Sequence, residues 1–313
     1  MSQKVVCLGG GHGLAATLKA MRNITSDVTA VVTVADNGGS SGRLREEFHS
    51  LPPGDLRMAL AALCGDDEWG KSWAEIMQYR FTSNGEMDNH AVGNLLLTAL
   101  WDRDGDPVKG LERVGALLRV VGKVLPMALD PLDIEGNFVI NGKPQTVRGQ
   151  IQVAAAKGEV TQIRLIPNAP KPTPEALLAI KSADWITLGP GSWLSSVMPH
   201  FLLKDQANAI LESSAKKILI FNLPDPTTTE EYADSSLSDH LQFILNHLPN
   251  FKFDYALIDN RISTNNSGFE SLVKKCGGIV VPFDLADNST TFHHDPNKLI
   301  SAFRHILQPN LLR

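Results

Sequence analysis

Several features are scarce in this chain of 313 residues, and each scarcity excludes a class of protein. The three cysteines, Cys7, Cys64 and Cys276, lie far apart and form no CxxC pair. They predict neither a disulfide framework nor a cysteine-ligated metal, and a reducing, cytoplasmic compartment is expected. Acidic residues outnumber basic ones, with a net charge of −5. A nucleic-acid partner is therefore not expected, because phosphate binding needs an excess of positive charge.

Long apolar runs are missing too. No run approaches the ~20 residues that span a bilayer. The N-terminus lacks the apolar core of a signal peptide, so no membrane insertion is expected. No glycine-lysine-serine/threonine sequence follows the glycines at Gly9–Gly13, so that stretch is not a P-loop. The chain does have 43% hydrophobic residues, enough for a sizeable core.

The apolar residues follow the pattern of a parallel sheet. Two continuous apolar runs, Lys4–Leu8 and Val28–Ala35, flank a segment with helical spacing. Strands that are apolar on both faces and separated by helices are typical of a parallel sheet covered on both sides. We therefore predict an α/β fold with a Rossmann-like, three-layer, mostly parallel sheet. Further strands are predicted at Trp185–Leu188, Lys217–Asn222, Tyr255–Asp259 and Gly278–Val281, and further helices at Leu56–Leu63, from Asn89–Asn94 to Leu100, at Val108–Val121, Pro174–Ser182 and Pro296–Leu307.

The pattern changes between about residues 126 and 167, where β-type segments surround Asn141-Gly142. An Asn-Gly pair between such segments is a strong signal for a β-hairpin. We predict a β-rich insertion there, within a single nucleotide-binding domain that spans residues 1–313.

Four loops that follow predicted strands are rich in glycine and small polar residues. They are Gly9–Gly13, Asp36–Gly42, Gly189–Ser192 and Asn222–Thr229. Such loops meet at the carboxyl edge of a parallel sheet, where ligands bind, and a helix N-terminus there suits phosphate. In the first loop the dinucleotide fingerprint fails, because Leu14 stands where the third glycine is required. This loop predicts phosphate or nucleotide binding, with a plain strand–helix turn as the alternative, and an NAD-dependent oxidoreductase is disfavoured.

The second loop adds charged side chains to the same edge. Its glycines and serines allow a ligand to approach the backbone closely. Arg43 and Arg45, which follow it, can form charge-assisted hydrogen bonds with phosphate. Asp36 could hold a metal ion or a ligand hydroxyl group.

Other polar residues give weaker signals. Asp55 is predicted to cap Leu56–Leu63, and Asn89 to cap the helix that follows it. The acidic run Asp66–Glu68 is interpreted as a solvated loop. His293-His294-Asp295 is a weak candidate for metal binding, because adjacent ligands on a loop are poor indicators of a metal site.

Five stretches together resemble one family. They are GGGHGL at Gly9–Leu14, TVADNGGSSGRLR at Thr33–Arg45, LPPGDLRMAL at Leu51–Leu60, NHAVGNLLL at Asn89–Leu97 and LGPGSWLSSVMP at Leu188–Pro199. They resemble the gluconeogenesis factors, also called the YvcK-like family, which is related to the CofD family of 2-phospho-L-lactate transferases. The resemblance covers nearly the whole chain, most clearly residues 4–200, and the pair DNGGSSGRLR and PPGDLR is highly specific.

The resemblance implies a nucleotide pocket at the carboxyl edge of the sheet. Gluconeogenesis factors bind UDP-sugars, notably UDP-N-acetylglucosamine, and support cell shape and wall-precursor supply on gluconeogenic carbon. It thus implies a cytoplasmic regulatory protein that requires no cofactor, acts through a protein partner in wall-precursor synthesis and could form a homodimer. The alternative is a CofD-like enzyme, which uses Mg²⁺ to transfer a phospholactyl group from a guanosine diphospho donor to a deazaflavin.

Two departures from the family pattern bear on this choice. Asn37 stands where the family usually has a second aspartate, which disfavours metal-dependent catalysis, and His293 replaces an arginine implicated in UDP-sugar binding. The regulator needs no catalytic or metal-binding residue; in a transferase, Asp36 would hold the metal, and Asp36 and Arg43 would be catalytic. The expected ligand-binding residues are Gly9, Gly10, Gly11, His12, Gly13, Asp36, Asn37, Gly38, Gly39, Ser40, Ser41, Arg43, Asp55, Arg57, His90, Asn94, Gly189, Pro190, Gly191 and Ser192.

Overall fold

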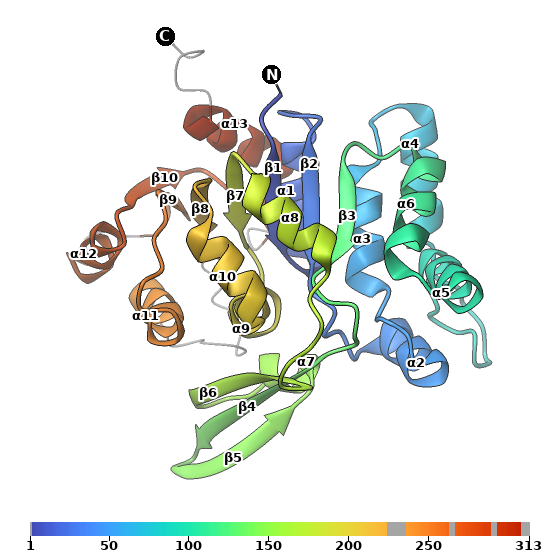
Figure 1. Cartoon of the computed structure of the whole chain (residues 1–313), viewed down its shortest axis with the longest axis horizontal. Helices are drawn as coiled ribbons and strands as arrows, with labels where there is room; N and C mark the ends of the chain where they lie inside the picture. Colours follow the sequence, from blue (N-terminus) through green and yellow to red (C-terminus); the bar gives the residue numbers. More distant parts are fainter. Residues whose placement is uncertain (1, 224–235, 263–266, 289–292, 308–313) are drawn as a thin grey trace.

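The computed structural model describes residues 2–223, 236–262, 267–288 and 293–307. Its main sheet has seven strands in the order β10-β9-β8-β7-β1-β2-β3, and all neighbouring strands run parallel (Figure 1). The predicted α/β fold is confirmed. The strands are β1 Val5–Gly9, β2 Val28–Val32, β3 Lys123–Pro126, β7 Trp185–Leu188, β8 Lys216–Ile220, β9 Tyr255–Asp259 and β10 Ile279–Phe283.

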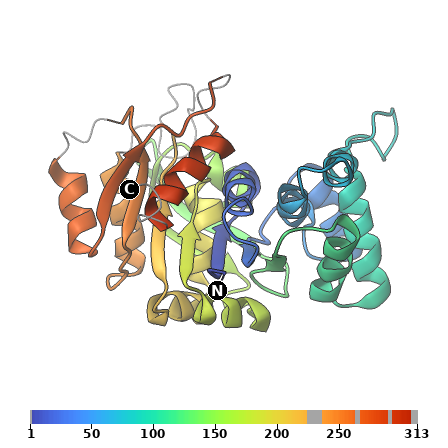
Figure 2. The same cartoon turned by 90° about the horizontal axis from the view of Figure 1, so that it is seen from above.

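Helices cover both faces of this sheet (Figure 2). On one face, α1 (Gly11–Met21) packs against α3 (Gly54–Leu63) and α13 (Pro296–Leu307). On the other face, α8 (Pro174–Ser182) packs against α10 (Lys204–Glu212). This arrangement explains the continuous apolar strands, because both sides of each central strand are buried.

A further group of helices lies beyond β3 (Figure 2). It consists of α4 (Glu68–Gln78), α5 (Val92–Asp104) and α6 (Pro107–Leu118), and α2 (Gly39–Phe48) packs against α5. The remaining helices are α7 Gln150–Ala154, the π-helix η1 Trp193–Val197, α9 Met198–Leu202, α11 Leu237–His247 and α12 Ser267–Lys275. Within the described residues, no helix is both long enough and apolar enough to cross a bilayer.

The predicted β-rich insertion is an antiparallel sheet of β4 (Asp133–Ile140), β5 (Lys143–Arg148) and β6 (Glu159–Ile166), with β4 in the middle. Asn141 and Gly142 form its turn with φ of 52° and 73°, the left-handed backbone that a tight hairpin requires. The insertion lies beyond the carboxyl edge of the main sheet (Figure 1), where α7 packs against η1.

Two local predictions are wrong, and a third describes its segment only in part. Helix α3 begins at Gly54 with Pro53 at the cap position, so Asp55 lies in its first turn and does not cap it. Helix α5 begins at Val92 after Ala91, and Asn89 stands outside it with a φ of 62°. The acidic run is more than a loop, because the side chain of Asp67 accepts a hydrogen bond from the Gly70 N–H and caps α4.

One strand was not predicted, and one predicted loop is described only in part. The edge strand β3 was not predicted, because it has only four residues and no long apolar run marks it. Of the loop Asn222–Thr229, residues 222 and 223 are described, and residues 224–229 lie outside the described residues.

Candidate functional site

The strand order reverses next to β1. The chain runs from β1 outward to β2 and β3 on one side, and from β7 outward to β8, β9 and β10 on the other. Ligands of open α/β sheets bind outside the carboxyl ends of the strands at such a switch point. The loops that leave β1 and β7 here are Gly9–Gly13 and Gly189–Ser192, so two of the predicted ligand loops lie side by side.

These two loops touch, and glycine makes the contact possible. A side chain on Gly13 would collide with the carbonyl group of Pro190. A Cβ on Gly10 would lie 2.5 Å from Thr33 Oγ1 and 2.6 Å from Asp55 Oδ2. Asn222 holds the loop Gly189–Ser192 in place. Its side-chain amide accepts a hydrogen bond from the Gly191 N–H and donates one to the Gly191 carbonyl oxygen, each at 2.9 Å. Backbone groups of both loops therefore line the place where the loops meet.

The N-terminus of α1 lies at this meeting place. Gly10 caps the helix without a side-chain hydrogen bond. The N–H groups of His12 and Gly13 have no acceptor among the described residues. Free N–H groups at a helix N-terminus attract an anion, and the helix dipole adds to that attraction. This is the part of the site that suits a phosphate or diphosphate group.

Asp55 is buried beside the same helix end. Burial raises the pKa of its carboxyl group to about 7, and the neighbouring Asp36 carboxylate adds to the rise. The N–H of Gly11 and the hydroxyl of Thr33 oppose that rise in pKa. Only part of the helix N-terminus is therefore open to a ligand, because Asp55 already occupies the side that faces Gly11.

Asp36, in the loop after β2, and Asp55, in the first turn of α3, form a carboxylate pair. One oxygen of Asp36 accepts a hydrogen bond from the Gly38 N–H at 2.9 Å. The other points towards α3, where a Cβ on Gly54 would lie 2.7 Å from it. Mg²⁺ is commonly held by one or two carboxylates together with ligand phosphates and water. The pair fits that role, although the described residues contain no group of three or more His, Cys, Asp or Glu arranged for a metal.

Several residues that were expected to bind a ligand hydrogen-bond to other protein groups and support the site. Ser40 Oγ lies 3.0 Å from His90 Nδ1 and accepts a hydrogen bond of 3.0 Å from Asn94 Nδ2, and all three side chains are buried. Burial lowers the pKa of His90, which keeps its ring neutral. Ser41 Oγ accepts a hydrogen bond from the Gly54 N–H at 2.9 Å. This network fastens the start of α2 to α5 and α3.

The side chains of Arg43 and Asn37 are also engaged by protein groups. The Arg43 guanidinium donates to the carbonyl groups of Glu86 and Asp88 at 2.7 and 2.6 Å. Asn37 donates to Gln152 Oε1 at 3.0 Å and accepts from the Ile151 N–H at 3.3 Å. Both a donor and an acceptor are needed in that contact, which explains an amide rather than a carboxylate at position 37.

The remaining predicted arginines have partners as well. Arg45 pairs with Asp133 at 2.7 Å. Arg57 is buried and donates to Gln78 and to the Met77 carbonyl group, while its Nε atom has no partner among the described residues. Burial lowers the pKa of Arg57 to about 10, so it remains a cation beside the two carboxylates.

The C-terminal part of the chain returns to the first loop. The rings of His12 and His293 lie 6.3 Å apart, and burial together with His293 lowers the pKa of His12. His294 points elsewhere, because its Nε2 lies 3.2 Å from the Phe221 carbonyl oxygen. Asp295 binds the Asn297 N–H at 2.7 Å. The three adjacent residues therefore do not converge on one metal.

Comparison with known proteins identifies the family. A family model described as 2-phospho-L-lactate transferase CofD matches residues 5–301. The chain belongs to the CofD family.

Relatives of this CofD-family chain share one name. A Mycobacterium tuberculosis protein, provisionally named gluconeogenesis factor, is 43% identical over 96% of this chain and 90% of its own length. A gluconeogenesis factor from Listeria monocytogenes is 35% identical over 82% of this chain and 77% of its own. A Bacillus halodurans crystal structure, described as a member of the UPF0052 family, is 32% identical with a TM-score of 0.85 and covers 96% of this chain and 98% of its own. The resemblance to the gluconeogenesis factors and the fold are confirmed.

Sequence reasoning missed two buried residues behind the first loop of this CofD-family protein. His200 Nε2 lies 3.4 Å from the carbonyl oxygen of Gly9, and Gln206 Nε2 lies 2.6 Å from His200 Nδ1. Burial lowers the pKa of His200 to about 4. The ring is thus neutral, accepts from Gln206 and donates to Gly9. No local motif marks this pair, because it joins α9 and α10 to β1 only in the folded chain.

Proposed function

We propose that this CofD-family chain is a regulatory protein that binds a UDP-sugar of the UDP-N-acetylglucosamine type at the switch point between β1 and β7. It would support cell shape and wall-precursor supply on gluconeogenic carbon, in the cytoplasm and through a protein partner, as a monomer or homodimer. The observation that carries the proposal is the contact between two glycine loops at the N-terminus of α1, where the N–H groups of His12 and Gly13 have no acceptor among the described residues. The names of the relatives support the link to gluconeogenesis.

The N–H groups at the N-terminus of α1 suit the diphosphate part of such a ligand. Helix N–H groups bind phosphate oxygens without discriminating between sugars. The rings of His12 and His293 lie 6.3 Å apart beside the first loop, and we expect them to contact the groups attached to the diphosphate. Binding in this form requires neither a metal ion nor a cofactor.

The test is calorimetric titration with UDP-N-acetylglucosamine and with GDP, each with and without Mg²⁺. We expect the uridine ligand to bind with or without the metal. A Gly13→Ala variant places a methyl group against Pro190 and should weaken binding, whereas Gly85→Ala, which has open space around it, should not. His12→Ala provides a second variant whose folding does not depend on that contact. Absence of uridine-ligand binding to a folded wild-type protein contradicts the proposal.

One observation favours a second candidate, a CofD-like transferase. The pair of Asp36 and Asp55 lies beside the helix end that would receive a diphosphate, and together they would hold Mg²⁺. Mg²⁺ held there would supply charge neutralisation at the diphosphate. In the transfer, a hydroxyl of the acceptor would form a bond to the phospholactyl phosphorus, the P–O bond within the diphosphate would break, and GMP would leave. This candidate predicts Mg²⁺-dependent binding of GDP, lost in Asp36→Asn and in Asp55→Asn, and turnover of a deazaflavin acceptor.

A further inference from the structure

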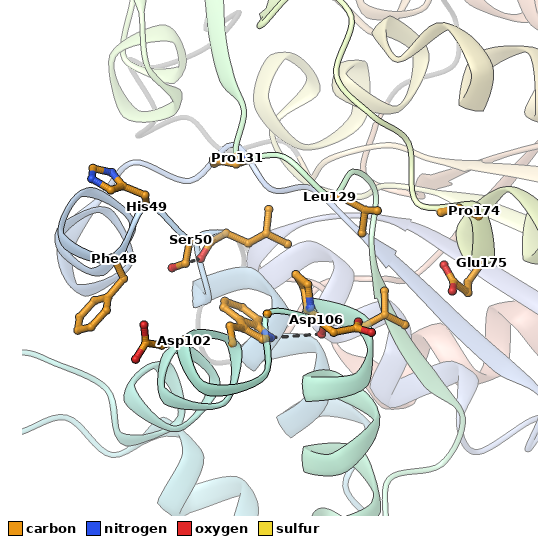
Figure 3. A pocket seen from close by; sticks show the side chains of 14 residues that line it. Phe48, His49, Ser50, Asp102, Asp106, Leu129, Pro131, Pro174 and Glu175 are labelled. Atoms are coloured by element: carbon orange, nitrogen blue, oxygen red, sulfur yellow. Dashed lines mark hydrogen bonds between the residues drawn. The ribbon is translucent and has the colours of Figure 1, made fainter.

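A separate cavity of about 510 Å³ is drawn in Figure 3, and no residue of the glycine loops lines it. It forms where the end of α2, the end of α5, the start of α6 and the start of α8 come together. None of the predicted ligand-binding residues lines it. Small-molecule sites commonly have volumes of about 300–1,000 Å³, so the cavity is large enough for a small organic ligand.

The wall of the cavity is mostly apolar and well fixed. Trp101 is 5% exposed, and its indole N–H donates to the Pro107 carbonyl group at 3.2 Å. The ring therefore has its polar atom satisfied. Leu51 and Val108 are buried beside it, and Phe48 is 43% exposed at the rim. Aromatic and aliphatic surface of this kind binds an apolar body, and aromatic faces also attract cations.

The charges that line the cavity have one sign. Three carboxylates contribute to it, and no lysine or arginine is among the described residues that line it. Asp106 is engaged, because it caps α6 and pairs with Lys109 at 3.2 Å. Asp102 and Glu175 have no hydrogen bond or ion pair within the described part of the chain. Figure 3 shows Asp102 near Phe48 at one end of the cavity and Glu175 near Pro174 at the other.

We propose that this cavity is a second ligand site, which takes a small organic cation: an amine or guanidinium group carried on an apolar, preferably aromatic body. The apolar wall binds the body, and a free carboxylate at either end pairs with the charge. A nucleotide or another anion is repelled by the same carboxylates. The helix α2 begins at Gly39, in the loop after β2, and ends at Phe48 in this cavity, so the two sites share one rigid element.

The site can be tested through the indole N–H signals of the protein. The chain has five tryptophans, and Trp101→Phe identifies the signal of the one in the cavity. In a titration of the ¹⁵N-labelled full chain with phenethylamine, we expect the Trp101 signal to shift saturably. The uncharged 2-phenylethanol should bind about tenfold more weakly, since it lacks the charge, and phenylacetate should not bind.

Variants and added salt distinguish a site that recognises a positive charge from one that binds apolar groups only. The double variant Asp102→Asn/Glu175→Gln should lower the affinity for phenethylamine to that of the alcohol, and added salt should weaken binding of the amine only. Glu112→Gln, an exposed change on α6 outside the cavity, should have no effect. An unmoved Trp101 signal, equal binding of amine and alcohol, or an unaffected double variant overturns the proposal. A shift of the Trp101 signal that occurs only with N-acetyl-leucyl-arginine amide also overturns the proposal, because it would indicate a protein partner.

Discussion

The buried Asp55 carboxyl group should make the stability of this protein depend on pH. Burial and the Asp36 carboxylate raise its pKa from 3.8 to about 7 in the folded chain. The folded state therefore holds the proton more tightly than the unfolded state does, so stability that is present below the unfolded pKa is lost as the pH rises towards the folded pKa. Between about pH 5 and pH 8, linkage with these two pKa values gives a loss of up to about 3 kcal/mol.

The assay is urea denaturation of wild type and Asp55→Asn at about pH 5 and about pH 8. The amide does not titrate. Between the two pH values, the free energy of unfolding of the variant should therefore fall by up to about 3 kcal/mol less than that of wild type. Any constant cost of the substitution cancels, because only the difference between the two pH values is compared. Asp66→Asn serves as the control, since pairing with Arg22 lowers the pKa of Asp66 and places its titration below this range. If wild type and Asp55→Asn change in parallel, the reasoning is refuted.

Three further predictions concern the site and the insertion. His200→Phe removes the hydrogen-bond donor to Gly9, which is worth about 1 kcal/mol. It should therefore weaken UDP-N-acetylglucosamine binding about fivefold, as measured by calorimetry. An unchanged affinity in the folded variant would show that His200 does not position this loop. Asn37→Asp removes the hydrogen bond donated to Gln152 and should lower the free energy of unfolding in urea by about 1 kcal/mol, and a neutral or stabilising result would contradict that contact. Gly142→Ala places a side chain at a φ of 73° in the hairpin turn and should lower the melting temperature, with a cost of about 1 kcal/mol; an equal or higher melting temperature would argue against the left-handed turn.

Much of the fold could be predicted from local patterns. The spans Trp185–Leu188, Tyr255–Asp259, Pro174–Ser182 and Pro296–Leu307 match β7, β9, α8 and α13 residue for residue. Strands that are buried on both faces must be apolar throughout, and the helices that cover them show spaced apolar residues, so composition and spacing were enough. The turn at Asn141-Gly142 was predictable for a different reason, because few residues tolerate its backbone.

The site could be predicted only in part. The glycine loops stand in the sequence as direct signals, and their meeting at the switch point follows from parallel strand order. Side-chain partners could not be predicted, because they join segments far apart in the chain. The sequence places Asn37 and Arg43 in a ligand loop, whereas the structure shows their polar groups bonded to the insertion and to the loop before α5.

The sequence by itself determined the layered α/β architecture, the hairpin and the glycine loops, because each depends on residues close together in the chain. Only the tertiary structure decided that Asp36 and Asp55 are neighbours, that His200 supports Gly9, and that Trp101 faces an acidic cavity. Burial and distance between remote segments set these relations, and neither quantity exists until the chain is packed.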